Sequence, residues 1–295
     1  MRIVVTGSSG LLGSALVRVL RGEGRRVVSL VRRAPAGADE ARWDPRGGEV
    51  DRSALDGADA VVHLAGAGLG DRRWTPSRRR EIVASRVEGT RTLVRAMASL
   101  DRPPRVLLSG SAIGFYGDTG DRAVDETAPA GTGFLADLVR AWEAEAIAAE
   151  EFTRVVRLRT GLVQTARGGS LRRILPIFRL GLGAPLGSGR QYWSWITLHD
   201  WVGAVCFLLE SEVFGPVNLT APEPVTNAEY TRALGRAVRR PTWPIRVPGF
   251  ALRAALGGFA DEGVLIGQRV LPARLAEAGY AFQHPGLGPA LRAVL

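Results

Sequence analysis

The chain has 295 residues, 46% of them hydrophobic, and a formal net charge of +10. The apolar share is ample for a core, but no run of 18 or more apolar residues predicts a membrane span, so no membrane partner is expected. The lone cysteine, Cys206, excludes an internal disulfide framework and a cysteine-based zinc site. The N-terminus enters a strand pattern directly, without the features of a signal peptide, which indicates a cytoplasmic protein.

All 39 basic residues are arginines, because the sequence contains no lysine. No residue of this chain can therefore act as a catalytic lysine. The arginines are scattered among acids, and the longest run is Arg78-Arg79-Arg80. This scatter favours a solvated basic surface and an anionic cofactor over nucleic acid as a partner.

The first 160 residues alternate between short apolar strands and amphipathic helices. Strands are expected at residues 2–6, 27–31, 60–65, 105–110 and 153–161, and helices at 11–22, 76–100 and 134–151. Apolar strands separated by helices are typical of a parallel sheet covered on both faces. The pattern predicts an α/β fold with a Rossmann-type doubly wound parallel sheet over residues 1–163.

After residue 161 the pattern changes. Residues 168–191 are rich in glycine and contain two prolines, and a helix at 199–211 and a short strand at 215–221 follow. From Thr226 onward, prolines interrupt the helices. We expect a smaller C-terminal substrate domain over residues 164–295, with residues 196–220 returning to the main sheet.

Three glycines, Gly7, Gly10 and Gly13, stand between the first strand and the first helix. Such glycines permit a tight turn, close approach to a pyrophosphate and close helix–strand packing, while the helix N-terminus offers free N–H groups to the anion. An ordinary tight turn is the less favoured alternative. The pattern predicts a dinucleotide-binding loop made of Gly7, Ser9, Gly10, Leu11, Leu12 and Gly13.

The second strand ends at Arg32 and Arg33, where a site for NAD usually carries an acid that accepts from the ribose 2′-hydroxyl. A guanidinium can instead bind a 2′-phosphate with two hydrogen bonds. The two arginines therefore favour NADP(H) over NAD(H). The alternative is that both are solvated residues of an arginine-rich loop.

The glycine spacing and the stretch HLAG at 63–66 resemble the extended short-chain dehydrogenase/reductase superfamily. The resemblance implies a Rossmann core, a C-terminal substrate domain and a Ser/Tyr/Lys catalytic group. The lysine cannot exist here, and Phe134 and Leu138 stand within about one residue of the expected tyrosine and lysine positions. Ser111 remains where the serine belongs. The proton-transfer candidates are Ser111, Tyr116 and His199.

The resemblance extends almost end to end to the atypical, epimerase-like family named after the human short-chain dehydrogenase/reductase family 39U member. It implies NADP(H) as cofactor and places Leu64, Ala65, Gly66, Glu81 and Arg86 beside it, although Arg86 also fits a surface helix arginine. The matching stretches are ARWDP (41–45), DRRWTPSRRREIVASRVEGT (71–90), SAIGFYG (111–117), FLADLVRAWE (134–143), RTGLV (159–163), GLGAPLGSGRQYWSWITLHD (181–200), GPVNLTAPEPVTNAEY (215–230) and GQRVLPARLAEAGY (267–280).

The glycine-rich tract 181–195 is the candidate substrate site. Its Arg190, Gln191, Tyr192 and Trp195 suit a polar or anionic ligand, and a core strand with packed aromatic residues is the open alternative. His63 lies in an apolar strand, which favours a buried core histidine. The three histidines are far apart in sequence, so no metal site is expected.

Two functions remain open at this point. One is an NADP(H)-dependent oxidoreductase or epimerase that acts on an unknown, nucleotide-sugar-like or other small molecule. The other is a catalytically weak NADP(H)-binding regulatory or redox-sensor protein, which the missing Tyr-Lys pair favours. Both a monomer and a homodimer fit the sequence.

Overall fold

The computed structural model describes residues 1–295, and its centre is an eight-stranded sheet in the order β12-β8-β6-β5-β1-β2-β3-β4. All neighbouring strands are parallel except β3 and β4, which form an antiparallel hairpin. The predicted Rossmann-type doubly wound sheet is confirmed; the β3–β4 hairpin was not predicted. The strands are β1 (Arg2–Thr6), β2 (Arg26–Val31), β3 (Glu40–Asp44), β4 (Glu49–Val50), β5 (Ala60–His63), β6 (Val106–Ala112), β8 (Arg154–Thr160) and β12 (Gly215–Leu219).

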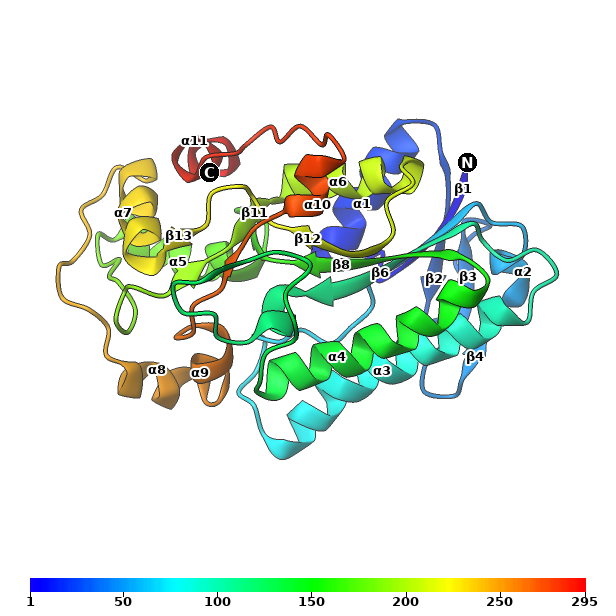
Figure 1. The fold of residues 1–295 in the computed structure, drawn as a ribbon, viewed down its shortest axis with the longest axis horizontal. Helices are drawn as coiled ribbons and strands as arrows, with labels where there is room; N and C mark the ends of the chain where they lie inside the picture. Colours follow the sequence, from blue (N-terminus) through cyan, green and yellow to red (C-terminus); the bar gives the residue numbers. More distant parts are fainter.

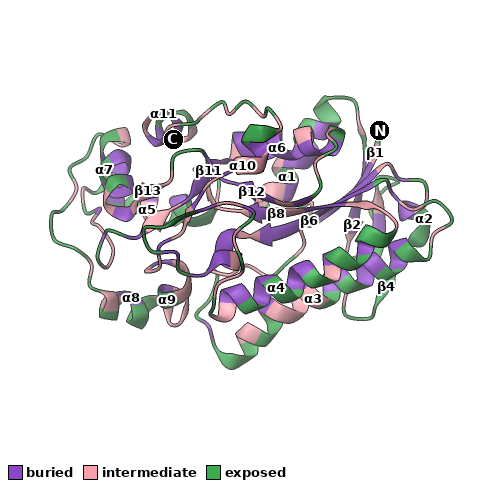
Figure 2. Ribbon diagram, in the orientation of Figure 1, coloured by how far each residue is buried: buried purple, intermediate pink, exposed green.

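Helices cover both faces of this sheet. α1 (Leu11–Gly22) and α6 (Leu198–Glu210) pack on one face, and α3 (Pro76–Ala98) and α4 (Phe134–Ile147) on the other (Figure 1). Successive side chains of a strand point to opposite faces. In β1, for example, Ile3 and Val5 join the core under α1 and α6, while Val4 joins the core under α3. Figure 2 shows the central strands buried and the outer helix surfaces exposed.

The helix N-termini show where backbone donors are left free. Thr75 caps α3 by accepting from the Arg78 N–H at 3.1 Å, and Thr197 caps α6 by accepting from the Asp200 N–H at 3.0 Å. α1 begins after Gly10, with no side-chain cap and no acid in its first turn. Its first N–H groups are therefore available to an anion.

Most other elements of the second half gather beyond the β12 edge of the sheet, whereas α6 packs on the sheet beside α1 (Figure 1). A third core joins α5 (Gly169–Arg179), α7 (Asn227–Ala237) and α11 (Leu287–Val294) through residues such as Leu171, Leu234 and Leu291. No helix is both long and apolar enough to cross a membrane. The remaining elements are α2 (Arg52–Leu55), η1 (Ile113–Tyr116), β7 (Ala123–Val124), η2 (Ala148–Glu151), β9 (Leu162–Gln164), α5 (Gly169–Arg179), β10 (Tyr192–Trp193), β11 (Trp195–Thr197), β13 (Val225–Thr226), α7 (Asn227–Ala237), α8 (Gly249–Leu256), α9 (Phe259–Gly263), β14 (Arg269–Val270), α10 (Ala273–Glu277) and α11 (Leu287–Val294).

His63 lies fully buried at the C-terminal end of β5. Its Nδ1 is 2.7 Å from the Thr6 hydroxyl, and its Nε2 is 3.0 Å from the Thr90 hydroxyl. Burial lowers the pKa of His63 to about 4. The ring is therefore neutral in the folded protein at neutral pH, and both of its nitrogens are used in the core.

This buried histidine predicts a loss of stability in acid. An unfolded histidine has a pKa of about 6.5, so above that pH neither state is protonated and the full stability is present. As the pH falls from about 6.5 to about 4, the unfolded chain takes up a proton that folded His63 refuses, which costs about 3 kcal/mol. Urea denaturation between pH 7 and pH 4 measures this loss. A His63→Gln variant should lack this component, and identical pH dependence in the two proteins would refute the prediction.

Candidate functional site

The glycine loop between β1 and α1 is closed by backbone atoms alone. Gly7 adopts φ +68°, and the Gly10 N–H donates to the Gly7 carbonyl at 3.0 Å. A Cβ on Gly13 would lie 2.2 Å from the Gly7 carbonyl oxygen, and one on Gly7 would lie 2.8 Å from the Leu64 carbonyl carbon. Only glycine fits at either position. Ser9, Leu11 and Leu12 complete the loop and the first turn of α1.

The segment after β5 is tied to this loop through Thr6. The Thr6 hydroxyl accepts from the Leu64 N–H at 3.0 Å and from the Ala65 N–H at 3.2 Å. Gly66 follows, and a Cβ there would lie 3.2 Å from the central guanidinium carbon of Arg86. The structure thus brings Leu64, Ala65, Gly66 and Arg86 to the same edge of the sheet as the glycine loop.

Arg86 is a buried cation without a counter-ion. It is only 8% exposed, donates one hydrogen bond to the Ile82 carbonyl at 3.3 Å, and lies over the Trp142 ring at 5.2 Å. Burial, and secondarily the charge of Arg78, lower the pKa of Arg86 to about 10. The guanidinium therefore stays charged at neutral pH, and an anion bound beside it would supply the missing partner.

Glu81 lies five residues before Arg86 on α3 and accepts a hydrogen bond from Arg78. The Arg78 guanidinium donates to the Glu81 carboxylate at 2.7 Å and to the Gly68 carbonyl at 2.5 Å. The Nε of Arg78 is buried and has no hydrogen-bond partner. The hydrogen bond from Arg78 lowers the pKa of Glu81. Glu81 thereby positions Arg78, whose charge also acts on the unpaired Arg86.

The two arginines after β2 differ in their partners. Arg33 donates to both oxygens of Glu40, at 2.7 and 2.5 Å, and this contact lowers the pKa of Glu40. Arg32 is exposed and makes no hydrogen bond or ion pair. Arg32 is therefore the free guanidinium of the two, while Arg33 fastens the turn that leads to β3.

Ser111 and Tyr116 meet in one buried network at the C-terminal ends of β6, β8 and β12. Ser111, Arg159 and Asn218 are neighbours in register across these strands. The Ser111 hydroxyl donates to Glu143 at 2.6 Å, and Arg159 donates to both Glu143 oxygens at 2.8 and 2.9 Å. Arg159 also donates to the Tyr116 hydroxyl at 2.9 Å, which in turn donates to Asn218 at 2.7 Å.

This network holds its protons tightly. Burial raises the pKa of Tyr116 to about 12, although Arg159 partly opposes the shift. The Ser111 hydroxyl keeps its proton and donates a hydrogen bond to the Glu143 carboxylate, which is also paired with Arg159. Sequence reasoning missed Glu143, Arg159 and Asn218, because their convergence depends on strand register and on the packing of α4.

The face of α4 where a Tyr-Lys pair would stand is apolar. Phe134 packs against Trp74 with ring centroids 5.1 Å apart, and Leu138 is 3% exposed. Two backbone N–H groups at the start of α4, those of Phe134 and Leu135, donate to Glu262 of α9 at 3.1 Å. The helix N-terminus is thus held by the C-terminal segment of the chain.

His199 does not belong to the Ser111–Tyr116 network. It is exposed in the first turn of α6, and its ring lies 5.6 Å from that of His284. Between them, Asp200 is buried. The long sequence separation that argued against a shared histidine site is therefore misleading, because the segment between α10 and α11 returns His284 to α6.

The candidate substrate residues fall into two groups. Arg190 is exposed, and the partly exposed Tyr192 carries the Arg269 guanidinium 4.8 Å above its ring. Gln191 is buried and donates to the Leu186 and Val264 carbonyls at 3.0 and 3.3 Å. Trp195 is fully buried and donates to the Glu223 carbonyl at 3.0 Å. The first group is accessible from solvent, whereas the second belongs to the core.

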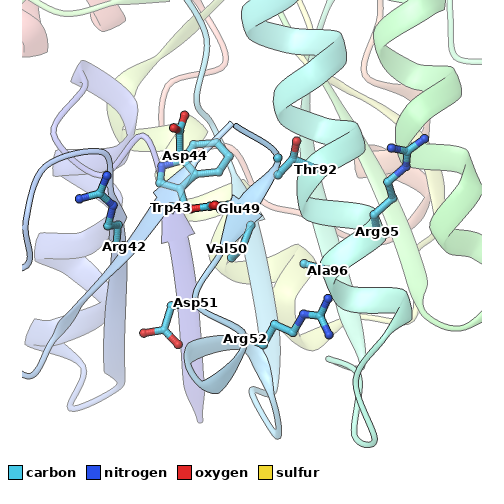
Figure 3. Close-up of a pocket in the computed structure, with 11 residues that line it drawn as sticks. Arg42, Trp43, Asp44, Glu49, Val50, Asp51, Arg52, Thr92, Arg95 and Ala96 are labelled. Carbon is cyan, nitrogen blue, oxygen red and sulfur yellow. The ribbon is translucent and has the colours of Figure 1, made fainter. Parts of the chain in front are cut away.

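A separate pocket of about 470 Å³ lies between the β3–β4 hairpin and α3. Figure 3 shows Arg42 and Arg95 on opposite sides of it and Trp43 between the neighbouring acids. Two of the acidic residues that line the pocket already accept hydrogen bonds from nearby backbone groups: Asp44 accepts from the Arg46 N–H and Asp51 from the Ser53 N–H. None of the predicted cofactor or substrate residues lines this pocket.

The chain matches known families over most of its length. Residues 3–219 match the model of the NAD dependent epimerase/dehydratase family. The chain belongs to this family. Its epimerase/dehydratase part covers the whole central sheet and α6, and residues 247–294 match a further domain of unknown function, DUF1731.

Relatives of the family resemble the chain from end to end. The epimerase family protein Mb2239 of Mycobacterium bovis is 50% identical to this chain, and the match covers 98% of this chain and 96% of the Mycobacterium protein. The crystal structure of human epimerase family protein SDR39U1 with NADPH matches with a TM-score of 0.91 at 34% identity, covering 100% of this chain and 99% of that chain. A nucleoside-diphosphate sugar epimerase from Corynebacterium glutamicum matches at TM-score 0.82 and 31% identity, covering 100% of this chain and 58% of that one. The resemblance to the epimerase-like family is thus confirmed.

Proposed function

We propose that the chain binds NADP(H) across the glycine loop, and the single observation that carries this is the buried, unpaired Arg86 beside that loop. The free N–H groups at the start of α1 would hold the pyrophosphate, and Arg32 would hold the 2′-phosphate. Leu64, Ala65 and Gly66 would border the bound cofactor. The human relative crystallised with NADPH supports the same assignment.

We further propose that the protein is an NADP(H)-dependent oxidoreductase or epimerase acting on a small molecule. NADP(H), when bound, supplies hydride transfer. A nucleotide-sugar-like substrate is favoured by the name of the Corynebacterium relative, and Arg190 and Tyr192 offer it a cation and an aromatic ring. Of the three candidates for proton transfer, Ser111 and Tyr116 lie together in the buried network and His199 lies apart from it, so Ser111 and Tyr116 are the proposed proton-handling groups.

The buried network and the apolar face of α4 favour a second function. With Ser111 and Tyr116 both engaged, the protein would hold NADP(H) as a regulatory or redox-sensing ligand with little turnover. Absorbance at 340 nm, measured with panels of nucleotide sugars and carbonyl compounds and paired with product analysis for epimers, tests the first function. Turnover supports the enzyme. If no substrate of either panel turns over, pull-downs with NADP⁺ and with NADPH test the sensor, which requires partners that differ between the two states.

The preference for NADP(H) should depend on Arg32 far more than on Arg33. Arg32→Asp replaces the free guanidinium with a charge that repels a 2′-phosphate, and a charge-assisted hydrogen bond contributes about 1.5–3 kcal/mol. NADPH binding should weaken by roughly ten- to a hundredfold while NADH binding is unchanged. Calorimetric titration with both nucleotides measures this. In the comparison variant Arg33→Ala, the loss of binding free energy for NADPH should be less than half of that in Arg32→Asp. An equal loss of NADPH affinity in both variants would contradict the assignment.

A further inference from the structure

A second site lies at the N-terminus of α6, apart from the glycine loop. His199 and Asp200 are in the first turn of this helix, and His284 comes from the segment between α10 and α11. One donor atom from each residue lies within 4.8 Å of the others. Two of the three histidines of the chain thus face the same buried carboxylate.

We propose that His199, Asp200 and His284 form a binding site for one divalent cation of the class that prefers imidazole ligands, represented by Zn²⁺. Two histidines and one carboxylate are a donor set that Zn²⁺ takes in four-coordinate sites, with water in the remaining position. Ligand atoms about 2.1 Å from a tetrahedral ion stand about 3.4 Å apart. The His284 Nδ1 and the Asp200 Oδ2 are already 3.5 Å apart.

His199 supplies the adjustable ligand. Its side chain is exposed, makes no hydrogen bond and already lies against the His284 ring, so it can turn toward the other two ligands without breaking a hydrogen bond. Asp200 is held by three hydrogen bonds, and the His284 Nδ1 lies 3.3 Å from the Thr197 hydroxyl. Hard cations such as Mg²⁺ and Ca²⁺ prefer an all-oxygen set and are poorly matched to these two imidazoles.

Asp200 is held in the way that metal-ligating carboxylates usually are. It accepts from the Gln283 N–H at 2.7 Å and from the His284 N–H at 3.0 Å, and the Thr197 hydroxyl donates to it at 3.1 Å. Hydrogen bonds of this kind orient a ligand before the ion arrives. The same contacts position His284, so a bound ion would fasten the segment before α11 to α6.

The rest of the chain offers few competing ligands of this type. His63 is fully buried with both ring nitrogens in hydrogen bonds. Cys206 is the only thiol, and burial raises its pKa to about 11, which keeps it protonated and a poor ligand. Histidine-dependent binding can therefore be assigned to His199 and His284.

The test is a calorimetric titration of the tag-free, full-length protein with ZnCl₂. Wild-type protein should bind one ion per chain. His199→Ala and His284→Ala should each weaken binding at least tenfold, whereas the matched control Cys206→Ser should bind as the wild type does. In thermal melting, Zn²⁺ should raise the Tm of wild type and Cys206→Ser but not that of His199→Ala.

His199→Ala decides the outcome if His284→Ala does not fold, because the His199 side chain is exposed and makes no hydrogen bond. Absence of saturable binding to the wild type would overturn the proposal. Equal affinity of wild type and His199→Ala, or loss of binding in Cys206→Ser, would do the same.

Discussion

Gly13→Ala is expected to abolish NADPH binding and to destabilise the folded protein. The added methyl would lie 2.2 Å from the Gly7 carbonyl oxygen and 2.9 Å from the Ser8 Cα, and both are backbone atoms that no rotamer change can move. The loop must therefore open. Overpacking of this kind typically costs about 1–3 kcal/mol, and the displaced N–H groups should raise the Kd for NADPH more than a hundredfold.

A glycine at the other end of the same helix provides the control for this substitution. A Cβ on Gly22 meets nothing within 4 Å, and alanine is favoured over glycine within a helix by about 0.5–1 kcal/mol. Gly22→Ala should keep the Kd for NADPH and slightly raise the urea midpoint. If Gly13→Ala bound NADPH like Gly22→Ala, the glycine loop would not be the cofactor cradle.

Arg86→Met is expected to change stability and binding in opposite directions. Without ligand, the variant should be more stable by about 1 kcal/mol, because a buried charge that lacks a partner is replaced by an apolar side chain of similar size. NADPH binding should weaken by roughly ten- to a hundredfold, since a charge-assisted hydrogen bond is lost. Urea denaturation without ligand and calorimetric titration with NADPH measure the two effects.

The control for Arg86→Met is Arg91→Met on the same helix. Arg91 is exposed and paired with Glu145 at 2.5 Å, and such surface pairs contribute little. The free energy of unfolding of this variant should stay within about 0.5 kcal/mol of the wild-type value, and its affinity for NADPH should be unchanged. A ligand-free Arg86→Met protein that is less stable than the wild type would show that Arg86 is a structural residue.

The fold of the first half was readable from sequence because its signals are local. Apolar runs such as residues 2–6 and 60–65 are long enough to mark buried strands, and Gly7, Gly10 and Gly13 mark the turn into α1. The β3–β4 hairpin was not predicted because residues 40–44 mix charged and apolar side chains, and because β4 has only two residues. The structure of this hairpin is determined by its pairing with β2 and its packing against α3. These contacts between separate elements produce no local sequence pattern.

Only part of the candidate site could be predicted from the sequence, because some of its residues are brought together by contacts between separate elements. The glycine loop lies within one strand–turn–helix unit, so its residues could be named at once. The distinction between Arg32 and Arg33 depends on Glu40, and the engagement of Ser111 depends on Glu143, which are contacts between separate elements. The approach of His284 to His199 depends on the path of the whole C-terminal segment.

Calorimetric titration of the purified protein with NADPH and with NADH is the most direct test of the cofactor assignment. Saturable binding of one NADPH per chain, at least tenfold tighter than that of NADH, is the predicted result. No measurable uptake of either nucleotide would contradict the role given to the glycine loop, Arg32 and Arg86.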